Sequence, residues 1–103
     1  MKFSQAMMAL AAATAMQFAA SPAALATGKM KCDSGPQSTW KSRTDLESKL
    51  TKDGWKVKKS KVDGGCYEVY GVTPEGQNVE AYFHPVTMEK LLVSQRGKVI
   101  FKK

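Results

Sequence analysis

An apolar segment at the start of the chain limits how much of it can fold. Lys2 precedes a mostly apolar run from Ala6 to Ala20, and Ala24-Leu25-Ala26 has the small–x–small pattern of a cleavage site. These are the parts of a cleavable export signal, and the run is too short and too polar for a stable membrane span. Removal of residues 1–26 from the 103-residue chain would leave 77 residues. We therefore predict a periplasmic or secreted bacterial protein that is not integral to the membrane after cleavage.

The part left after cleavage contains two cysteines, Cys32 and Cys66. A domain of this size buries only about 60% of its unfolded surface, so small exported domains commonly need a covalent link. The compartment reached by an export signal is oxidising, and two cysteines allow one intramolecular pair. We expect a Cys32–Cys66 disulfide that closes a loop of about 35 residues and contributes about 3–4 kcal/mol in the chain-entropy model.

The residues after the signal predict an irregular arm and then one short helix. Residues 27–39 are polar and are interrupted by glycine and proline, which predicts the arm. The segment Thr44-Asp45-Leu46-Glu47 fits a capping box, and Gly54 can supply a left-handed C-terminal cap. We expect an amphipathic helix from about Arg43 to Asp53.

Beyond the helix the hydrophobic period changes to two, which predicts an antiparallel meander. Asp63-Gly64-Gly65 and Thr73-Pro74-Glu75-Gly76 are turn signals. The alternation slips within the first strand, and a bulge near Lys59 would restore its register. Residues 40–103 should thus form a single α+β domain, with one short amphipathic helix packed on an antiparallel β-meander of about three to five strands. The strands are expected at residues 55–62, 66–72, 78–84, 89–94 and 98–101.

The same alternation sorts the side chains of the middle strands onto two faces. Tyr67, Val69, Val79, Ala81 and Phe83 should face the helix, because an antiparallel sheet can leave its other face in water. The other face is the candidate binding face. Tyrosine is enriched where proteins meet, although two tyrosines on adjacent strands also stabilise each other across the strands, so both interpretations stay open. Besides Cys66, the candidate binding face carries Glu68, Tyr70, Glu80, Tyr82 and His84.

Residues for catalysis or metal binding are sparse. His84 is the only histidine, and no nucleophile-elbow pattern accompanies it. Structural zinc sites normally have close ligand pairs such as CxxC or HxxxH, and covalent haem attachment needs CxxCH; the chain has none of these. We therefore predict no catalytic residue, no metal ligand and no cofactor.

Lysines predict a basic patch on the first strand. The net charge falls from +7 to +6 when Lys2 leaves with the signal. The patch could attract an acidic surface, such as lipid head groups, envelope polysaccharide or an acidic protein. We favour the other interpretation, in which these lysines protect an edge strand against pairing with other chains. Nucleic acid is not expected in an exported compartment. The patch consists of Lys56, Lys58, Lys59 and Lys61.

The spacing of residues across three elements resembles the PepSY domain, a module of secreted metallopeptidase propeptides and of small exported proteins. The resemblance covers roughly residues 40–93. It departs at His84-Pro85-Val86-Thr87-Met88, where the family usually has Asp-Pro-x-Thr-Gly, and this departure suggests a different local conformation. The matching segments are Leu50-x3-Gly54-Trp55-x-Val57, Val62-x2-Gly65-x-Tyr67-Glu68-Val69 and Gly76-x2-Val79-Glu80-Ala81-Tyr82-Phe83-x-Pro85-x-Thr87.

The resemblance implies a non-catalytic exported module that binds and regulates another protein. The partner would be an envelope or secreted protein, with a peptidase as the first expectation, and the module would modulate or inhibit it. The family contributes no catalytic residues. The alternative function is an accessory role in envelope redox or in metal or haem handling, which would require a reactive thiol, a metal or a haem.

Overall fold

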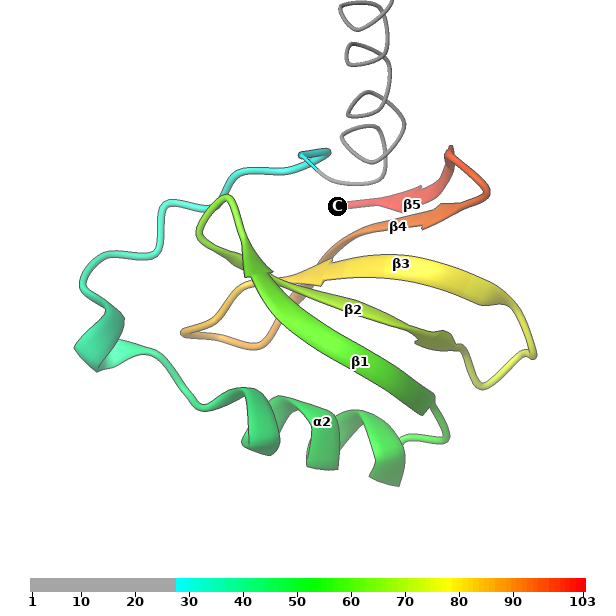
Figure 1. The fold of residues 1–103 in the computed structure, drawn as a ribbon, viewed down its shortest axis with the longest axis horizontal. Coiled ribbons are helices and arrows are strands. Elements are labelled where there is room, and N and C mark those ends of the chain that lie inside the picture. Colours follow the sequence, from blue (N-terminus) through cyan, green and yellow to red (C-terminus); the bar gives the residue numbers. More distant parts are fainter. Residues whose placement is uncertain (1–27) are drawn as a thin grey trace, which may run out of the picture.

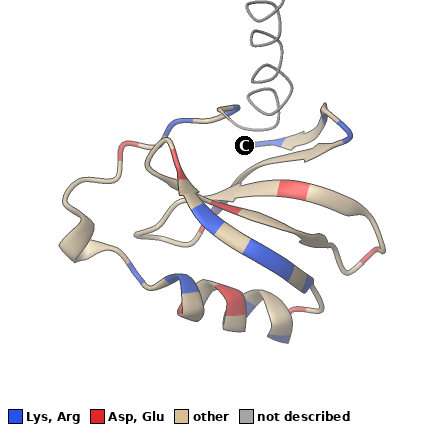
Figure 2. Cartoon of the chain, in the orientation of Figure 1, with Lys and Arg blue, Asp and Glu red and all other residues tan. Residues whose placement is uncertain are grey.

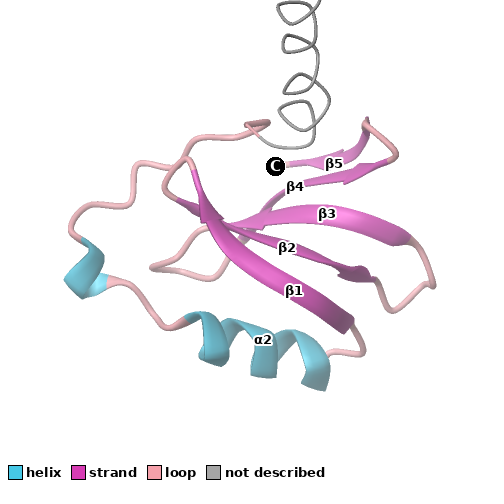
Figure 3. Ribbon diagram, in the orientation of Figure 1, coloured by secondary structure: helices cyan, strands magenta, loops and turns pink. Residues whose placement is uncertain are grey.

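The computed structural model describes residues 28–103, and the predicted export signal lies outside them. These residues form a five-stranded antiparallel sheet with strands in chain order, and one α-helix lies beside β1 (Figures 1 and 3). The predicted α+β class, with one short helix and a meander, is confirmed. No helix among the described residues is long and apolar enough to cross a membrane. The elements are η1 (Gln37–Thr39), α2 (Arg43–Lys52), β1 (Lys56–Asp63), β2 (Cys66–Val72), β3 (Asn78–Phe83), β4 (Lys90–Gln95) and β5 (Lys98–Lys102).

The N-terminus of α2 differs from the predicted capping box. Ser42 is the N-cap, and its Oγ accepts a hydrogen bond from the Asp45 N–H at 3.0 Å. Thr44 already lies inside the helix, so the prediction of Thr44 as the cap was wrong by two residues. The Glu47 carboxylate does not reach back to the cap; it accepts a hydrogen bond from the Ser60 hydroxyl on β1. Glu47 therefore fastens the helix to the sheet.

The C-terminus of α2 has the predicted left-handed cap. Gly54 has a φ of 102°, and its N–H donates to the Thr51 carbonyl at 3.1 Å. The next residue, Trp55, donates its N–H to the Leu50 carbonyl at 2.9 Å. These two bonds form a Schellman motif, which satisfies the last helical carbonyls and turns the chain into β1.

The hydrophobic core lies between α2 and one face of the sheet. Leu46 is completely buried, and the face of β2 and β3 that was predicted to meet the helix does so. Trp55 and Phe83 pack edge to face with ring centroids 5.9 Å apart. The core cluster consists of Leu46, Leu50, Trp55, Tyr67, Val69, Val79, Ala81, Phe83 and Val93.

Two predicted features fix the register of β1 against β2. Gly64 and Gly65 have φ values of 62° and 81° and form the two-residue turn between Asp63 and Cys66. The register shifts between Val57 and Lys59, which is the predicted bulge. Beyond the bulge, Lys59 and later β1 residues pair with β2 one position out of phase with the start of the strand.

Candidate binding face

Side chains cross the candidate binding face in two rows. We call the row that the N-terminal arm covers the arm row, and the neighbouring row the outer row. Cross-strand pairing in the arm row places Glu68 opposite Tyr82, and in the outer row it places Tyr70 opposite Glu80. Each tyrosine therefore faces a glutamate, and the two tyrosines are not direct cross-strand partners. The arm row contains Lys61, Glu68, Tyr82 and Leu92, and the outer row contains Lys59, Tyr70, Glu80 and Ser94.

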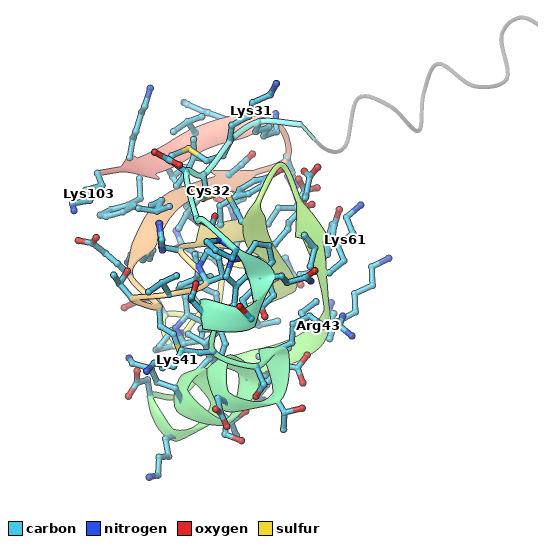
Figure 4. The ribbon with its side chains drawn as sticks, turned by 90° about the vertical axis from the view of Figure 1, so that its left-hand side faces the viewer. Lys31, Cys32, Lys41, Arg43, Lys61 and Lys103 are labelled. Atoms are coloured by element: carbon cyan, nitrogen blue, oxygen red, sulfur yellow. A yellow bond between two sulfur atoms is a disulfide. The ribbon has the colours of Figure 1, made fainter. Side chains whose placement is uncertain are left out.

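The N-terminal arm covers the arm row. The predicted disulfide between Cys32 and Cys66 is present and joins the arm to the first residue of β2. Figure 4 shows the segment with Lys31 and Cys32 passing over the end of the sheet. Met30 and Cys32 pack against Cys66, Tyr82 and Leu92 in a second apolar cluster. The arm thus gives this end of the sheet a second small core on the side away from α2.

The turn between β1 and β2 is shaped to receive the arm. The Cys32 N–H donates to the Gly64 carbonyl at 2.8 Å, and the Ser34 hydroxyl donates to the Gly65 carbonyl. A Cβ at Gly65 would lie 2.6 Å from the Cys32 carbonyl oxygen, and one at Gly64 would lie 2.5 Å from that of Met30. The two glycines therefore serve the tight turn and also the close approach of the arm.

The expectation of an uncovered face is wrong for the arm row. Glu68, Tyr82 and Cys66 are each 0% exposed. The reason is covalent, because the disulfide draws the arm across these residues. With the arm in place, Glu68 and Tyr82 have no exposed surface that could contact a partner. The Tyr82 hydroxyl forms two internal hydrogen bonds: it donates to Asp63 Oδ2 at 3.1 Å and accepts from the Lys29 N–H at 3.3 Å.

Glu68 is a buried carboxylate whose loss of hydration is only partly offset by interactions with neighbouring groups. Neither of its carboxylate oxygens has a hydrogen-bond partner of normal geometry among the described residues. The Lys61 Nζ lies 3.8 Å from Oε1, which is close enough for attraction but long for a hydrogen bond. Burial raises the pKa of Glu68, and the nearby Tyr70 hydroxyl and Lys61 ammonium oppose this rise only in part. The charged form is therefore less favourable in the folded protein than in the unfolded chain.

We expect Glu68→Gln to raise the thermal unfolding midpoint at about pH 7. A carboxyl whose pKa is raised on folding stabilises the folded state most when the pH is below its ordinary pKa of 4.5. This contribution is lost as the pH rises through the pKa of the folded state. Glutamine keeps the shape of the protonated acid, so the gain should shrink at about pH 4. Thermal melts at both pH values measure it, with Glu80→Gln in the open outer row as the control. A Glu68→Gln protein less stable than the parent at about pH 7 would show that attraction to Lys61 outweighs burial.

Three residues of the outer row, Lys59, Tyr70 and Glu80, remain accessible. Tyr70 is half-buried, and the Lys59 Nζ lies 4.8 Å from the centroid of its ring, within cation–π distance. Burial, followed by the nearby Glu68 carboxylate, raises the pKa of the Tyr70 hydroxyl, so it stays protonated. A pocket of about 240 Å³ opens beside Tyr70 over β2, β3 and β4. Ser94 lies in it fully buried, and its Oγ has no hydrogen-bond partner among residues 28–103.

The basic patch joins the outer row. Lys58 lines the Tyr70 pocket and donates to Asn78 Oδ1 at 3.1 Å, while Lys59 and Lys61 lie over the Tyr70 ring. Figure 2 shows the Lys and Arg positions of β1 as blue segments along that strand. The bulge in β1 causes it, because it brings Lys59 opposite Tyr70. Lys56 is exposed at the start of the strand.

His84 does not join either row. Its Nδ1 accepts the Val86 N–H at 3.1 Å, so the ring proton lies on Nε2, which is 3.3 Å from the Asp33 carbonyl. Met88, where the PepSY pattern has glycine, adopts a φ of 64°. His84 thus accepts a hydrogen bond within its own turn, and Met88 adopts a left-handed conformation that is uncommon for residues other than glycine. No group of three or more His, Cys, Asp or Glu within residues 28–103 could hold a metal.

The exposed apolar side chains of β5 form a surface that was not predicted from the sequence. Val99, Ile100 and Phe101 of β5 are 46%, 40% and 38% exposed. The sequence does indicate this surface, because three consecutive apolar residues lie between Lys98 and Lys102. In a strand with one face in water, apolar and polar residues should alternate.

A comparison with protein families found a match that covers most of the chain. The family model described as "Peptidase propeptide and YPEB domain" matches residues 7–92. Within the described residues, this range includes the arm, α2, the first three strands and half of β4. Comparison with curated proteins and with solved structures found no match.

Proposed function

The chain belongs to the PepSY family of peptidase propeptide and YPEB domains, and on that premise we propose that it is an exported, non-catalytic module that regulates a peptidase or another envelope protein by binding it. The local contacts of the side chains support this. Both ring nitrogens of His84 are engaged within its own turn and the arm, and Cys32 and Cys66 are bonded to each other. Neither the histidine nor a thiolate is therefore placed to act as a base or nucleophile.

The partial exposure of Tyr70 beside a pocket is the observation that best supports the proposed binding site. Of the two tyrosines on the candidate binding face, only Tyr70 retains exposed surface, and a pocket adjoins it. A partly exposed aromatic ring beside a pocket is the usual form of an interface hot spot, because it offers a large contact area with little side-chain entropy to lose.

The charges around Tyr70 indicate the chemistry of the partner. Lys59 and Lys61 lie over the ring, and Lys58 and Arg96 line the pocket, with Glu80 as the one acidic side chain among its lining residues. Such a rim favours an acidic partner surface and speeds its association. Binding should consequently weaken as salt is raised, since exposed charges are screened.

We expect Tyr70→Ala to reduce the affinity for the partner by at least about 30-fold, because truncation of an aromatic hot spot typically costs about 2 kcal/mol or more. The partner would be identified by crosslinking the protein in its native envelope, followed by mass spectrometry. Tyr70→Phe should keep most of the binding, since it keeps the ring. Val62→Ala, at a 46% exposed apolar residue of β1, is a matched surface control.

The unfolding midpoint of Tyr70→Ala should stay close to that of the parent protein, because Tyr70 is not in either apolar cluster. Unchanged capture by a folded Tyr70→Ala protein would rule out this half of the face as the binding site.

A further inference from the structure

The last strand of the sheet has an unusual combination of position and composition. β5 is an edge strand, with β4 on one side and no described strand on the other (Figure 1). Its three central side chains are apolar and exposed, Val99 at 46%, Ile100 at 40% and Phe101 at 38%. An exposed apolar edge is a template for pairing with another chain, and proteins normally protect it with charge, bulges or a covering element.

The opposite edge of the same sheet carries those protections. β1 is rich in lysine, and α2 lies against it (Figure 2). The Arg43 guanidinium donates to the Ser60 carbonyl of β1 at 2.6 Å, and the Ser60 hydroxyl donates to Glu47. Among residues 28–103, by contrast, no side chain hydrogen-bonds to a backbone group of β5 and no backbone group outside the sheet does so. β5 also has a bulge, at Ile100, and a lysine at each end, but among the described residues it has no covering element. This difference between the two edges points to β5 as the one left for pairing.

A groove of mixed character lies beside β5 on the helix side of the sheet. Because α2 packs over the β1 half of that face, a groove of about 210 Å³ is left in the other half. Trp55, Val93, Ile100 and Phe101 form its apolar part, and the turn after β2 and Lys90 add polar groups, among them Thr73, Glu75 and Gln77. The Lys90 Nζ lies over the Phe101 ring, 4.3 Å from its centroid. Alternate side chains of a strand added to β5 would point toward this groove, which has room for an apolar side chain.

The charges at the ends of β5 decide between a second copy and a different partner. β5 has a lysine at each end, so an antiparallel pair of two β5 strands would bring lysines of the two copies together at both ends. Like charges on paired strands destabilise the pair. Lys103 is already paired with Glu89 at 2.5 Å, whereas neither Lys98 nor Lys102 has an ion-pair partner among the described residues. An incoming strand with carboxylates at these two positions would satisfy both lysines.

We propose that β5 accepts, as a sixth antiparallel strand, an extended segment of a partner protein that has an apolar centre flanked by Asp or Glu. Backbone hydrogen bonds along β5 provide affinity, the groove beside Trp55 selects the apolar centre, and Lys98 and Lys102 select the acidic flanks. This surface lies at the edge of the sheet away from β1, so it does not depend on Tyr70. It stands even if the Tyr70 binding site is disproved.

The test uses the full-length chain and labelled peptides of about nine residues in fluorescence anisotropy. One peptide has the central pattern Glu-Val-Tyr-Val-Glu, a second replaces both Glu with Lys, and a third is the acidic peptide with alternate backbone nitrogens methylated. The acidic peptide should bind, the lysine peptide should bind on the order of tenfold more weakly because of the reversed charge pairs, and the methylated peptide should not bind. Equal binding of all three would overturn the proposal.

Protein variants locate the site. Ile100→Lys should abolish binding, whereas Val62→Lys, at an equally exposed apolar residue on the opposite edge strand, should leave it unchanged. The double variant Lys98→Glu with Lys102→Glu should reverse the preference in favour of the lysine peptide. Retention of the acidic preference by that variant would overturn the proposed charge recognition. All three variants change exposed side chains, and thermal melts should show that they fold as the parent does.

Two further outcomes separate the alternatives. Sedimentation should show a monomer; a dimer that Ile100→Lys disrupts would make a second copy the occupant of β5 and would overturn the proposal. One outcome of the envelope crosslinking experiment is that Ile100→Lys abolishes the crosslink to the partner while Tyr70→Ala leaves it intact. That outcome supports β5 as the binding strand and rejects the Tyr70 site. Loss with Tyr70→Ala but not with Ile100→Lys, together with no peptide binding, rejects β5 alone.

Discussion

Replacement of Cys32 and Cys66 by serine is expected to lower the free energy of unfolding by about 3–4 kcal/mol. The disulfide connects residues 34 positions apart, and in the chain-entropy model its loss returns that much conformational freedom to the unfolded chain. Because domains of this size have about 5–15 kcal/mol in total, the double variant should be marginal at growth temperature. Urea unfolding of the variant and of the parent measures the difference.

Reduction of the parent protein provides the matched control. It should shift the urea midpoint by a similar amount, since it removes the same bond without changing a side chain in the sequence. Hydrogen exchange at the Cys32 amide, which donates to the Gly64 carbonyl, reports whether the arm stays docked. A loss of less than about 1 kcal/mol with a protected Cys32 amide would show that hydrogen bonds and Met30 packing hold the arm unaided, contrary to the expected role of the disulfide.

The main strands were predictable because their signals are local. The Asp63-Gly64-Gly65 turn, the bulge near Lys59 and the left-handed cap at Gly54 all depend on a few adjacent residues, and each is confirmed. The predicted helix start at Arg43 is also confirmed, but its cap was misassigned, because Ser42 and Thr44 are both competent caps and lie two residues apart. Only the conformation of the chain before the helix decides between them, and Ser42 has the extended backbone that an N-cap requires.

The state of the candidate binding face could be predicted only in part. Strand alternation correctly placed Glu68 and Tyr70 on the side away from α2, and alternation cannot distinguish between them. What separates them is the path of the arm, which is set by the Cys32–Cys66 bond and by the hydrogen bonds to Gly64 and Gly65. Such contacts join segments more than 30 residues apart, and no periodic pattern records them. The same holds for the lysines of β1, because the bulge turns Lys59 toward Tyr70.

The burial of Tyr82 yields the second large effect, and it separates the two tyrosines of the face. Tyr82→Ala should lower the free energy of unfolding by about 3–5 kcal/mol, because truncation of a fully buried aromatic side chain leaves a cavity that its neighbours fill only partly. Met30, Cys66 and Leu92 pack around the ring, so the cavity would also loosen the arm. Tyr70→Ala, one row away, should cost far less stability while it removes binding.

Tyr82→Phe isolates the hydroxyl from the ring. It should cost only about 1–2 kcal/mol, for the hydrogen bonds to Asp63 and to the Lys29 N–H. Urea unfolding of Tyr82→Ala, Tyr82→Phe and Tyr70→Ala in parallel gives the ranking. If Tyr82→Ala were as stable as Tyr70→Ala, the arm would not bury this row in solution, and Glu68 and Tyr82 would return as contact residues. If the expected ranking holds, a binding experiment that mutates both tyrosines together cannot distinguish a lost interface from a lost fold, and only the single Tyr70 variant tests the interface.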